Sequence, residues 1–285
     1  MFPWCLSRQC IIDGRTGLLN TAPLYFRKHN GGILRLLLIF LWISLGSSLA
    51  RADNVLVFAA ASLKNALDEI GTEFERTQPH TVQFNFAGSS QIARQVVAGA
   101  PADLLITANV LWMDEAASHR VIMTDSRFHL ASNRLVIASV AREQIVLTQE
   151  SLQSTLGSGH IAMALIDSVP AGMYGKAALE ALDLWTDVQG QVVQTDHVLS
   201  ALRLVALGEV RWGIVYRSDV LADPTIFLAA EFPADTHPPI VYPVALTGHN
   251  EPSEGATAFH AYLKSERAQQ ILTKHGFQPP VENRS

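Results

Sequence analysis

The stretch Val55–Phe74, VLVFAAASLKNALDEIGTEF, indicates the class of fold more clearly than any other part of the sequence. Its first seven residues, Val55–Ala61, are an apolar run that is typical of a strand buried on both faces. From Leu63 onward, apolar residues recur every three or four positions, which indicates one face of an amphipathic helix. Ser62, between the two, is a residue type that commonly caps helix N-termini. A buried strand followed at once by a helix predicts an α/β protein.

The same unit recurs in the next part of the chain. The alternation of apolar and polar residues across 82–86 predicts a strand, and the turn Gly88-Ser89-Ser90 leads into a helix that Gly99 ends. Leu104–Thr107 is a further apolar run. Asn109 follows it and is well placed to cap another helix. Strands and helices therefore alternate, as a largely parallel sheet requires.

The second half continues the alternation without an internal repeat or a low-complexity linker. Helices are expected from Pro170-Ala171-Gly172, after Asp196-His197, and around Phe259 and Ile271. The predicted strands are Leu135–Ala138, Ile161–Ile166, Gly213–Tyr216 and Ile240–Thr247.

The N-terminal segment has the features of a secretory signal peptide. A short apolar core, Leu36–Leu45, follows three basic residues, and the small residues Ala50 and Ala52 come after it. We expect export and cleavage after residue 52. Cys5 and Cys10 both lie in the segment to be removed, so the mature chain of residues 53–285 has no cysteine to form a disulfide or carry a lipid anchor.

Charge argues against two classes of partner. Six of the 21 Lys and Arg residues, but only one of the 26 Asp and Glu residues, lie within residues 1–52, which leaves a net charge of about −10 on the mature chain. Nucleic acid and anionic membranes are therefore not expected partners. Any bound anion must be held by local dipoles.

Enzyme motifs are missing from the sequence. It contains no G-x-S-x-G elbow, no H-E-x-x-H pair and no G-x-x-x-x-G-K-[ST] loop. The histidines of the mature chain are scattered, without the spacing of metal ligands. The sequence therefore favours a binding protein over an enzyme.

Several strand-to-helix junctions could bind an anion. The helix starts at Ser62, Ser89, Ala171 and Val198 each offer unpaired backbone N–H groups at the positive end of a helix dipole. In doubly wound sheets such junctions lie at the carboxyl edge, where ligands bind. A single junction of this kind is more often only a helix cap, so the set must be judged together.

Four short motifs, which occur in a fixed order along the chain, indicate what these junctions do. They are Phe58–Leu63 (FAAASL), Ala98–Leu104 (AGAPADL), Val169–Tyr174 (VPAGMY) and Gly213–Tyr216 (GIVY). Together they resemble the periplasmic molybdate-binding proteins of bacterial ABC transporters, and the resemblance runs from residue 54 to residue 277. It implies the type II periplasmic-binding-protein fold, in which two α/β lobes close on a ligand. Lobe one would comprise residues 53–133 and 245–285, and lobe two residues 134–244.

The resemblance also implies the site. Ser62 and Ser89 would bind molybdate from lobe one, and Ala171, Val198 and Tyr216 from lobe two. Molybdate is fully deprotonated at neutral pH and accepts hydrogen bonds only; these residues can offer seven donors, three hydroxyls and four amides. Phosphate carries a proton and would need an acceptor. The oxyanion would be held without direct metal–ligand bonds or a cofactor, and tungstate, nearly the same size, is expected to bind similarly.

The remaining implications concern partners and alternatives. The resemblance implies a soluble periplasmic monomer that delivers molybdate to an ABC permease in the inner membrane. Sulfate or a small organic anion is the alternative ligand. An organic carboxylate would be expected to need an arginine clamp. The candidates for such a clamp are Arg94, Arg134, Arg203 and Arg217. We also expect His197, beside Val198, to raise the affinity for an anion when it is protonated.

Overall fold

A computed structural model describes residues 52–156, 159–248 and 251–280. The predicted signal peptide, residues 1–52, lies outside this part of the chain except for its last residue. Within the described ranges, no helix combines the length and the apolar character that crossing a membrane requires.

The first sheet has five strands in the order β2-β1-β3-β10-β4, and its elements are called lobe one here. β1, β2 and β3 run parallel, and β10 runs antiparallel to both of its neighbours. The strands are β1 (Asn54–Ala60), β2 (Thr81–Ala87), β3 (Leu104–Ile106), β4 (Phe128–Ser132) and β10 (Val241–Leu246).

The second sheet also has five strands, in the order β7-β6-β8-β5-β9, and its elements are called lobe two. β6 pairs in parallel with β7 and β8, whereas β5 is antiparallel to β8 and β9. The strands are β5 (Leu135–Ser139), β6 (Ile161–Ala164), β7 (Val192–Thr195), β8 (Trp212–Tyr216) and β9 (Phe227–Glu231).

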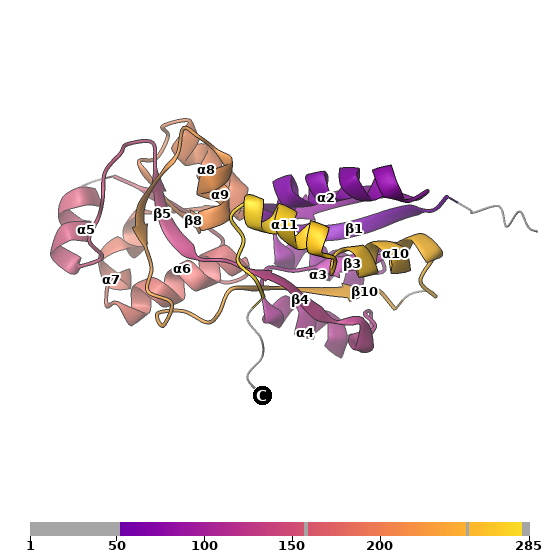
Figure 1. The fold of residues 1–285 in the computed structure, drawn as a ribbon. Coiled ribbons are helices and arrows are strands. Elements are labelled where there is room, and N and C mark those ends of the chain that lie inside the picture. Colours follow the sequence, from indigo (N-terminus) through magenta and orange to yellow (C-terminus); the bar gives the residue numbers. More distant parts are fainter. Residues whose placement is uncertain (1–51, 157–158, 249–250, 281–285) are drawn as a thin grey trace, which may run out of the picture. The chain divides into compact units, whose positions relative to one another are not determined.

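Helices pack against both sheets (Figure 1). Those of lobe one are α2 (Lys64–Thr77), α3 (Ser89–Val97), α4 (Val110–Ser118), α10 (Glu254–Tyr262) and α11 (Glu266–Lys274). Those of lobe two are α5 (Gln149–Leu156), α6 (Pro170–Ala181), α7 (Trp185–Val188), α8 (Val198–Ala206) and α9 (Arg217–Ala222). Short 3-10 turns complete the structure at η1 (Ala61–Leu63), η2 (Thr124–Ser126) and η3 (Gln189–Gln191).

Local sequence explains where several helices begin and end. Asn109 accepts the Trp112 N–H at 3.2 Å and so caps α4, and Pro170 occupies the first position of α6. Gly99, Gly208 and Gly276 have positive φ angles of 91°, 72° and 84° just beyond α3, α8 and α11. Glycine adopts this left-handed conformation without steric cost, which is why it ends helices.

Two connections pass between the sheets. The chain leaves β4 at Ser132 and enters β5 at Leu135. It returns between Glu231, at the end of β9, and Val241, at the start of β10. All six residues of β10 belong to the first sheet, so the expected boundary between residues 244 and 245 falls inside a strand of lobe one.

The architecture of two α/β lobes agrees with the fold expected from the sequence. One local prediction was wrong: Ser62 does not cap α2. The chain forms the turn η1 first, α2 begins at Lys64, and the Ser62 hydroxyl bonds to Tyr242 instead. This difference bears directly on the site, because it fixes the direction of a side chain at the end of β1.

Candidate functional site

The five residues proposed from the sequence line one cavity. Each follows or ends a strand at its carboxyl end: β1 leads to Ser62, β2 to Ser89, and β8 ends at Tyr216. The cavity is small, with about 210 Å³ of empty space including the part that is open to solvent. Its lining residues are Ala60, Ala61, Ser62, Ala87, Gly88, Ser89, Ala108, Val169, Pro170, Ala171, His197, Val198 and Tyr216. The five proposed residues therefore surround one small space between the lobes.

Lobe one contributes two buried serines. Ser62 is 9% exposed and Ser89 is 1% exposed. The Ser62 Oγ lies 3.1 Å from the Tyr242 Oη, and the Ser89 Oγ accepts the Ala108 N–H at 2.9 Å. Ser89 is the first residue of α3, so its own N–H precedes the first hydrogen bond of that helix, from Gln91 to Gly88. Each serine therefore brings a hydroxyl and an amide to the cavity wall.

Lobe two contributes two helix N-termini. α6 starts with Pro170, which has no N–H, so Ala171 carries the first amide of that helix. α8 starts at Val198, after His197, whose Nδ1 accepts the Ser200 N–H at 3.1 Å. Both amides come before the first hydrogen bonds of their helices, Met173 to Val169 and Ser200 to His197. The positive ends of two helix dipoles thus lie at the cavity.

Tyr216 supplies the fifth candidate group. Its Oη is buried and has no hydrogen-bond partner within the described residues. Burial raises the pKa of the Tyr216 phenol well above its usual value, so the group keeps its proton at neutral pH. A buried donor without a partner is costly. Because this donor lies in the cavity wall, an acceptor bound there would relieve that cost.

The electrostatics of the wall come from dipoles. The described lining residues include no Asp, Glu, Lys or Arg. None of the four arginines considered as an organic-acid clamp lines the cavity. Arg134 pairs with Glu231 at 2.6 Å, and Arg94 stacks over the Trp112 ring at 5.1 Å. The arrangement therefore offers hydrogen-bond donors to an acceptor that bears negative charge.

Further hydrogen bonds join the two lobes beside the cavity. The Trp112 Nε1–H of lobe one donates to the Ser168 carbonyl oxygen of lobe two at 2.7 Å. The Tyr174 hydroxyl of lobe two lies 3.4 Å from the Ala108 carbonyl oxygen. Gly88 also comes close to the other lobe, since a Cβ there would lie 2.9 Å from the Asp196 carbonyl oxygen. The lobes are thus in direct contact around the cavity.

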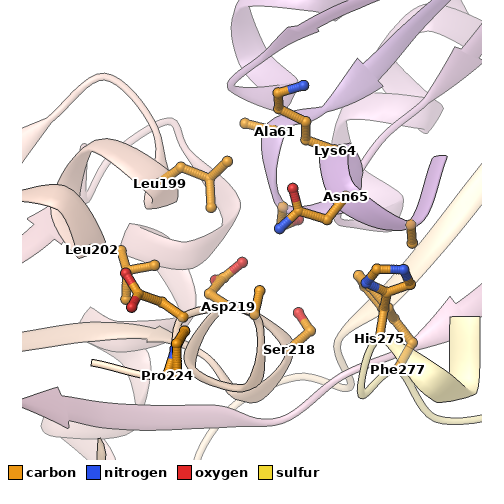
Figure 2. A pocket seen from close by; sticks show the side chains of 14 residues that line it. Ala61, Lys64, Asn65, Leu199, Leu202, Ser218, Asp219, Pro224, His275 and Phe277 are labelled. Carbon is orange, nitrogen blue, oxygen red and sulfur yellow. The ribbon is translucent and has the colours of Figure 1, made fainter. Parts of the chain in front are cut away.

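A second, larger cavity shares Ala61 and Ser62 with the first (Figure 2). It holds about 640 Å³ of empty space, and Asp219 and Asp223 are among its lining residues. Burial raises the pKa of the Asp219 carboxyl to about 7. Lys64 and His275 line it as well, so its wall carries charged side chains of both signs. The two helix N-termini and the Tyr216 hydroxyl belong to the smaller cavity, which is therefore the candidate anion site.

The two groups that hold the serine hydroxyls leave no signal in the sequence. Tyr242 and the backbone N–H of Ala108 hold the two serine hydroxyls, yet neither has a local pattern that points to this role. Tyr242 is 180 residues from Ser62 in the chain, and only the fold brings them together. No group of three or more His, Cys, Asp or Glu residues in the described chain could hold a metal ion. The binding roles of the five proposed residues stay predictions.

Comparison with known proteins places the chain in a family. Residues 55–278 match the family model described as "Bacterial extracellular solute-binding protein". The chain is 40% identical over 237 residues to the molybdate-binding protein ModA of Escherichia coli, which covers 81% of this chain and 91% of that protein. It is 34% identical to the Haemophilus influenzae protein of the same name, over 82% and 93% of the two chains.

Solved structures show the same fold. The periplasmic molybdate-binding protein of Azotobacter vinelandii matches with a TM-score of 0.71, over 80% of this chain and all of that one, at 23% identity. This family consists of proteins that bind solutes and are not enzymes. The chain belongs to the bacterial extracellular solute-binding proteins and is related within them to the ModA proteins.

Proposed function

We propose that this protein captures molybdate outside the cytoplasm and delivers it to an ABC importer. The observation that carries the proposal is one cavity lined by two serines, two helix N-termini and Tyr216, whose hydroxyl has no partner among the described residues, with no Asp or Glu among the described lining residues. Its relatives in Escherichia coli and Haemophilus influenzae are named as molybdate-binding proteins, which supports the same ligand here.

The chemistry of the wall fits a fully deprotonated oxyanion. Molybdate only accepts hydrogen bonds, so every donor of Ser62, Ser89, Ala171, Val198 and Tyr216 can be used. Hydrogen phosphate carries a proton of its own, which would face hydrogen-bond donors of the protein. Two donors that face each other leave a hydrogen bond unmade, which costs about 1–3 kcal/mol. Tungstate has the same charge and nearly the same size as molybdate, and we include it in the proposal.

Capture requires both lobes. The serines belong to lobe one and the other three residues to lobe two, so one anion bridges both and favours the closed arrangement. We further propose that the leader is removed on export, that the mature chain acts as a soluble periplasmic monomer, and that its loaded form docks on a permease in the inner membrane. These steps rest on the family and on the N-terminal sequence.

Sulfate is the competing ligand, because it also accepts hydrogen bonds only. Its bonds are shorter, so some donors would stay out of reach and unsatisfied. A thermal-unfolding series with no ligand, molybdate, tungstate, sulfate and phosphate at equal concentration separates these cases. A ligand at about a thousandfold over its dissociation constant adds about 4 kcal/mol. We expect a higher midpoint with molybdate and tungstate alone. A shift with sulfate instead would indicate that the protein delivers a different anion to a different importer.

A further inference from the structure

The hydroxyl of Ser62 belongs to a buried chain of hydrogen bonds that starts outside the candidate site. The Ser62 Oγ lies 3.1 Å from the Tyr242 Oη, on β10. The same Tyr242 oxygen lies 3.1 Å from the Asn133 Nδ2, where the chain passes from β4 to β5. Tyr242 is fully buried and Asn133 is 7% exposed. Water therefore does not compete strongly for these bonds.

The amide of Asn133 sets the direction of this chain. Its Oδ1 accepts the Arg134 N–H at 2.9 Å, so the NH2 group must face the other way. That group donates to the Ser218 Oγ at 2.8 Å and to the Tyr242 Oη. Tyr242 is therefore an acceptor in its bond with Asn133, and both amide protons of Asn133 are in use.

The consequence reaches Ser62. Burial raises the pKa of the Tyr242 phenol, so Tyr242 keeps one proton. Within the described residues its oxygen has two partners, and Asn133 already donates to it. The Tyr242 proton is then directed to the Ser62 Oγ. Since a hydroxyl has one proton, Ser62 accepts from Tyr242 and keeps its own proton for a different acceptor.

Ser89 shows the same arrangement with an unambiguous donor. A backbone N–H can only donate, and the Ala108 N–H donates to the Ser89 Oγ at 2.9 Å. Both serines of lobe one thus accept a hydrogen bond from the protein on one side and face the cavity on the other. The repetition at two independent positions argues against an accidental packing contact at Ser62.

We propose that Tyr242 and Asn133 are positioning residues that fix the Ser62 hydroxyl as a donor toward the bound oxyanion, and so contribute to selection against oxyanions that carry a proton. This inference rests on the proposed function. Tyr242 does not line the cavity and acts through Ser62. Without it, the Ser62 hydroxyl is free to rotate and can accept a proton from the ligand as readily as donate one.

A purely structural role makes a different prediction. Tyr242 packs edge to face against Tyr216 and Phe277, with ring centroids 6.2 and 5.4 Å apart. If packing were its whole contribution, Tyr242→Phe, which keeps the ring, would leave the preference among anions unchanged. A positioning role instead changes the ratio of affinities for acceptor-only and proton-bearing anions.

The test is a double-mutant cycle of Tyr242→Phe and Ser62→Ala. Isothermal titration calorimetry at pH 7 measures the affinity of each variant for molybdate and for inorganic phosphate. We expect Tyr242→Phe to weaken molybdate binding about tenfold, the effect of one hydrogen bond to a charged group, and to weaken phosphate binding less. In a Ser62→Ala background, Tyr242→Phe should have little further effect, because the group it positions is gone. Tyr262→Phe, on α10 and remote from the cavity, is the matched control.

Asn133→Asp provides a second variant with nearly the same shape. Its carboxylate accepts the Tyr242 proton, so Tyr242 accepts from Ser62 and the anion loses a donor. The effect of the added negative charge alone on anion binding is measured by making Asn133→Asp in the Ser62→Ala background. An equal molybdate-to-phosphate ratio in the wild type and in Tyr242→Phe, or an undiminished effect of Tyr242→Phe without Ser62, would overturn the inference. A wild-type protein that binds no molybdate would instead overturn the proposed function.

Discussion

The two lobes contribute to the candidate site in different ways. Lobe one offers side-chain hydroxyls, Ser62 and Ser89, each already hydrogen-bonded within its own lobe. Lobe two offers the backbone amides of Ala171 and Val198 together with Tyr216, whose hydroxyl has no partner in the described structure. The serine oxygens of lobe one thus already accept a hydrogen bond and only their protons are left for an anion, whereas the Tyr216 hydroxyl of lobe two has no partner at all among the described residues. We infer that lobe one fixes the direction of its donors before an anion binds, and that lobe two gains more hydrogen bonding when the lobes close on the anion.

The largest effect is expected from the backbone scaffold of lobe two. A Cβ at Gly172 would overlap the carbonyl oxygen of Ala164, so Gly172→Ala must push the start of α6 away from β6. We expect a loss of about 3 kcal/mol in unfolding free energy, and molybdate binding weakened at least tenfold because the Ala171 amide moves. Urea unfolding and calorimetric titration measure the two. Gly190→Ala is the control, since no atom lies within 4 Å of a Cβ there.

The next two substitutions, one in each lobe, should change the stability of the ligand-free protein in opposite directions. Ser89→Ala removes a donor from the site and also leaves the buried Ala108 N–H without its acceptor. We expect molybdate binding to weaken by about 2 kcal/mol and the ligand-free protein to lose about 1 kcal/mol of stability. If unfolding without ligand is unchanged, the bond between Ser89 and Ala108 contributes nothing and the contrast between the lobes is wrong.

Tyr216→Phe should move stability in the opposite direction. The substitution removes a buried hydroxyl that has no partner in the described structure, so we expect the ligand-free protein to gain about 1 kcal/mol. Molybdate binding should still weaken by about 1.5–2 kcal/mol, because one donor is lost. Thermal unfolding with and without molybdate gives both quantities in one experiment. A variant that is less stable without ligand would show that Tyr216 is already satisfied.

A smaller effect concerns pH. Burial raises the pKa of Asp219 to about 7, and its carboxylate accepts the Tyr216 N–H at 2.9 Å. Between pH 4 and 7 the folded protein then holds a proton that the unfolded chain has lost. Stability should fall as pH rises through this window, by up to about 1.4 kcal/mol per pH unit, and Asp219→Asn should flatten the slope. A slope unchanged by the substitution would contradict the assignment.

The same titration should affect binding. Protonation of Asp219 removes a negative charge next to Tyr216, so molybdate affinity should rise severalfold between pH 8 and pH 6, of the order that one partly screened charge produces. Calorimetric titrations of the wild type and of Asp219→Asn at both pH values isolate the contribution of this carboxyl. A wild-type affinity that does not change with pH would contradict the prediction.

The smallest effect should come from the residues that bind through their backbone. Val198 lines the cavity as the first residue of α8, and its proposed donor is its amide. Val198→Ala keeps that amide, so molybdate affinity should stay within about twofold, even if the loss of buried methyl groups lowers stability by about 1 kcal/mol. A tenfold loss of affinity would show that the side chain itself shapes the site.

The sequence was most informative where a local rule applies. Asn109 and Pro170 mark helix starts because capping and the missing proline N–H depend on neighbouring residues alone. Three of the candidates, Ser62, Ala171 and Tyr216, lie in the ordered motifs, and Ser89 and Val198 lie at helix starts after predicted turns. The structure places all five in the wall of one cavity.

The features that escaped prediction depend on distant parts of the chain. Strands β4, β7 and β9 all lie at sheet edges, where the burial that makes a strand visible in sequence is incomplete. The Ser62 contact with Tyr242 joins residues 180 positions apart, and the Ala108 donor is a backbone group of no distinctive type. Neither leaves a periodic signal, so only the folded chain shows them.

The position of the anion can be measured in a crystal of the protein grown with molybdate, with data collected at the molybdenum absorption edge. We expect one anomalous peak in the smaller cavity, within hydrogen-bond reach of the Ser62, Ser89 and Tyr216 hydroxyls once molybdate oxygens surround it. A peak in the larger cavity beside Asp219, or no peak at a concentration that raises the unfolding midpoint, would contradict this expectation.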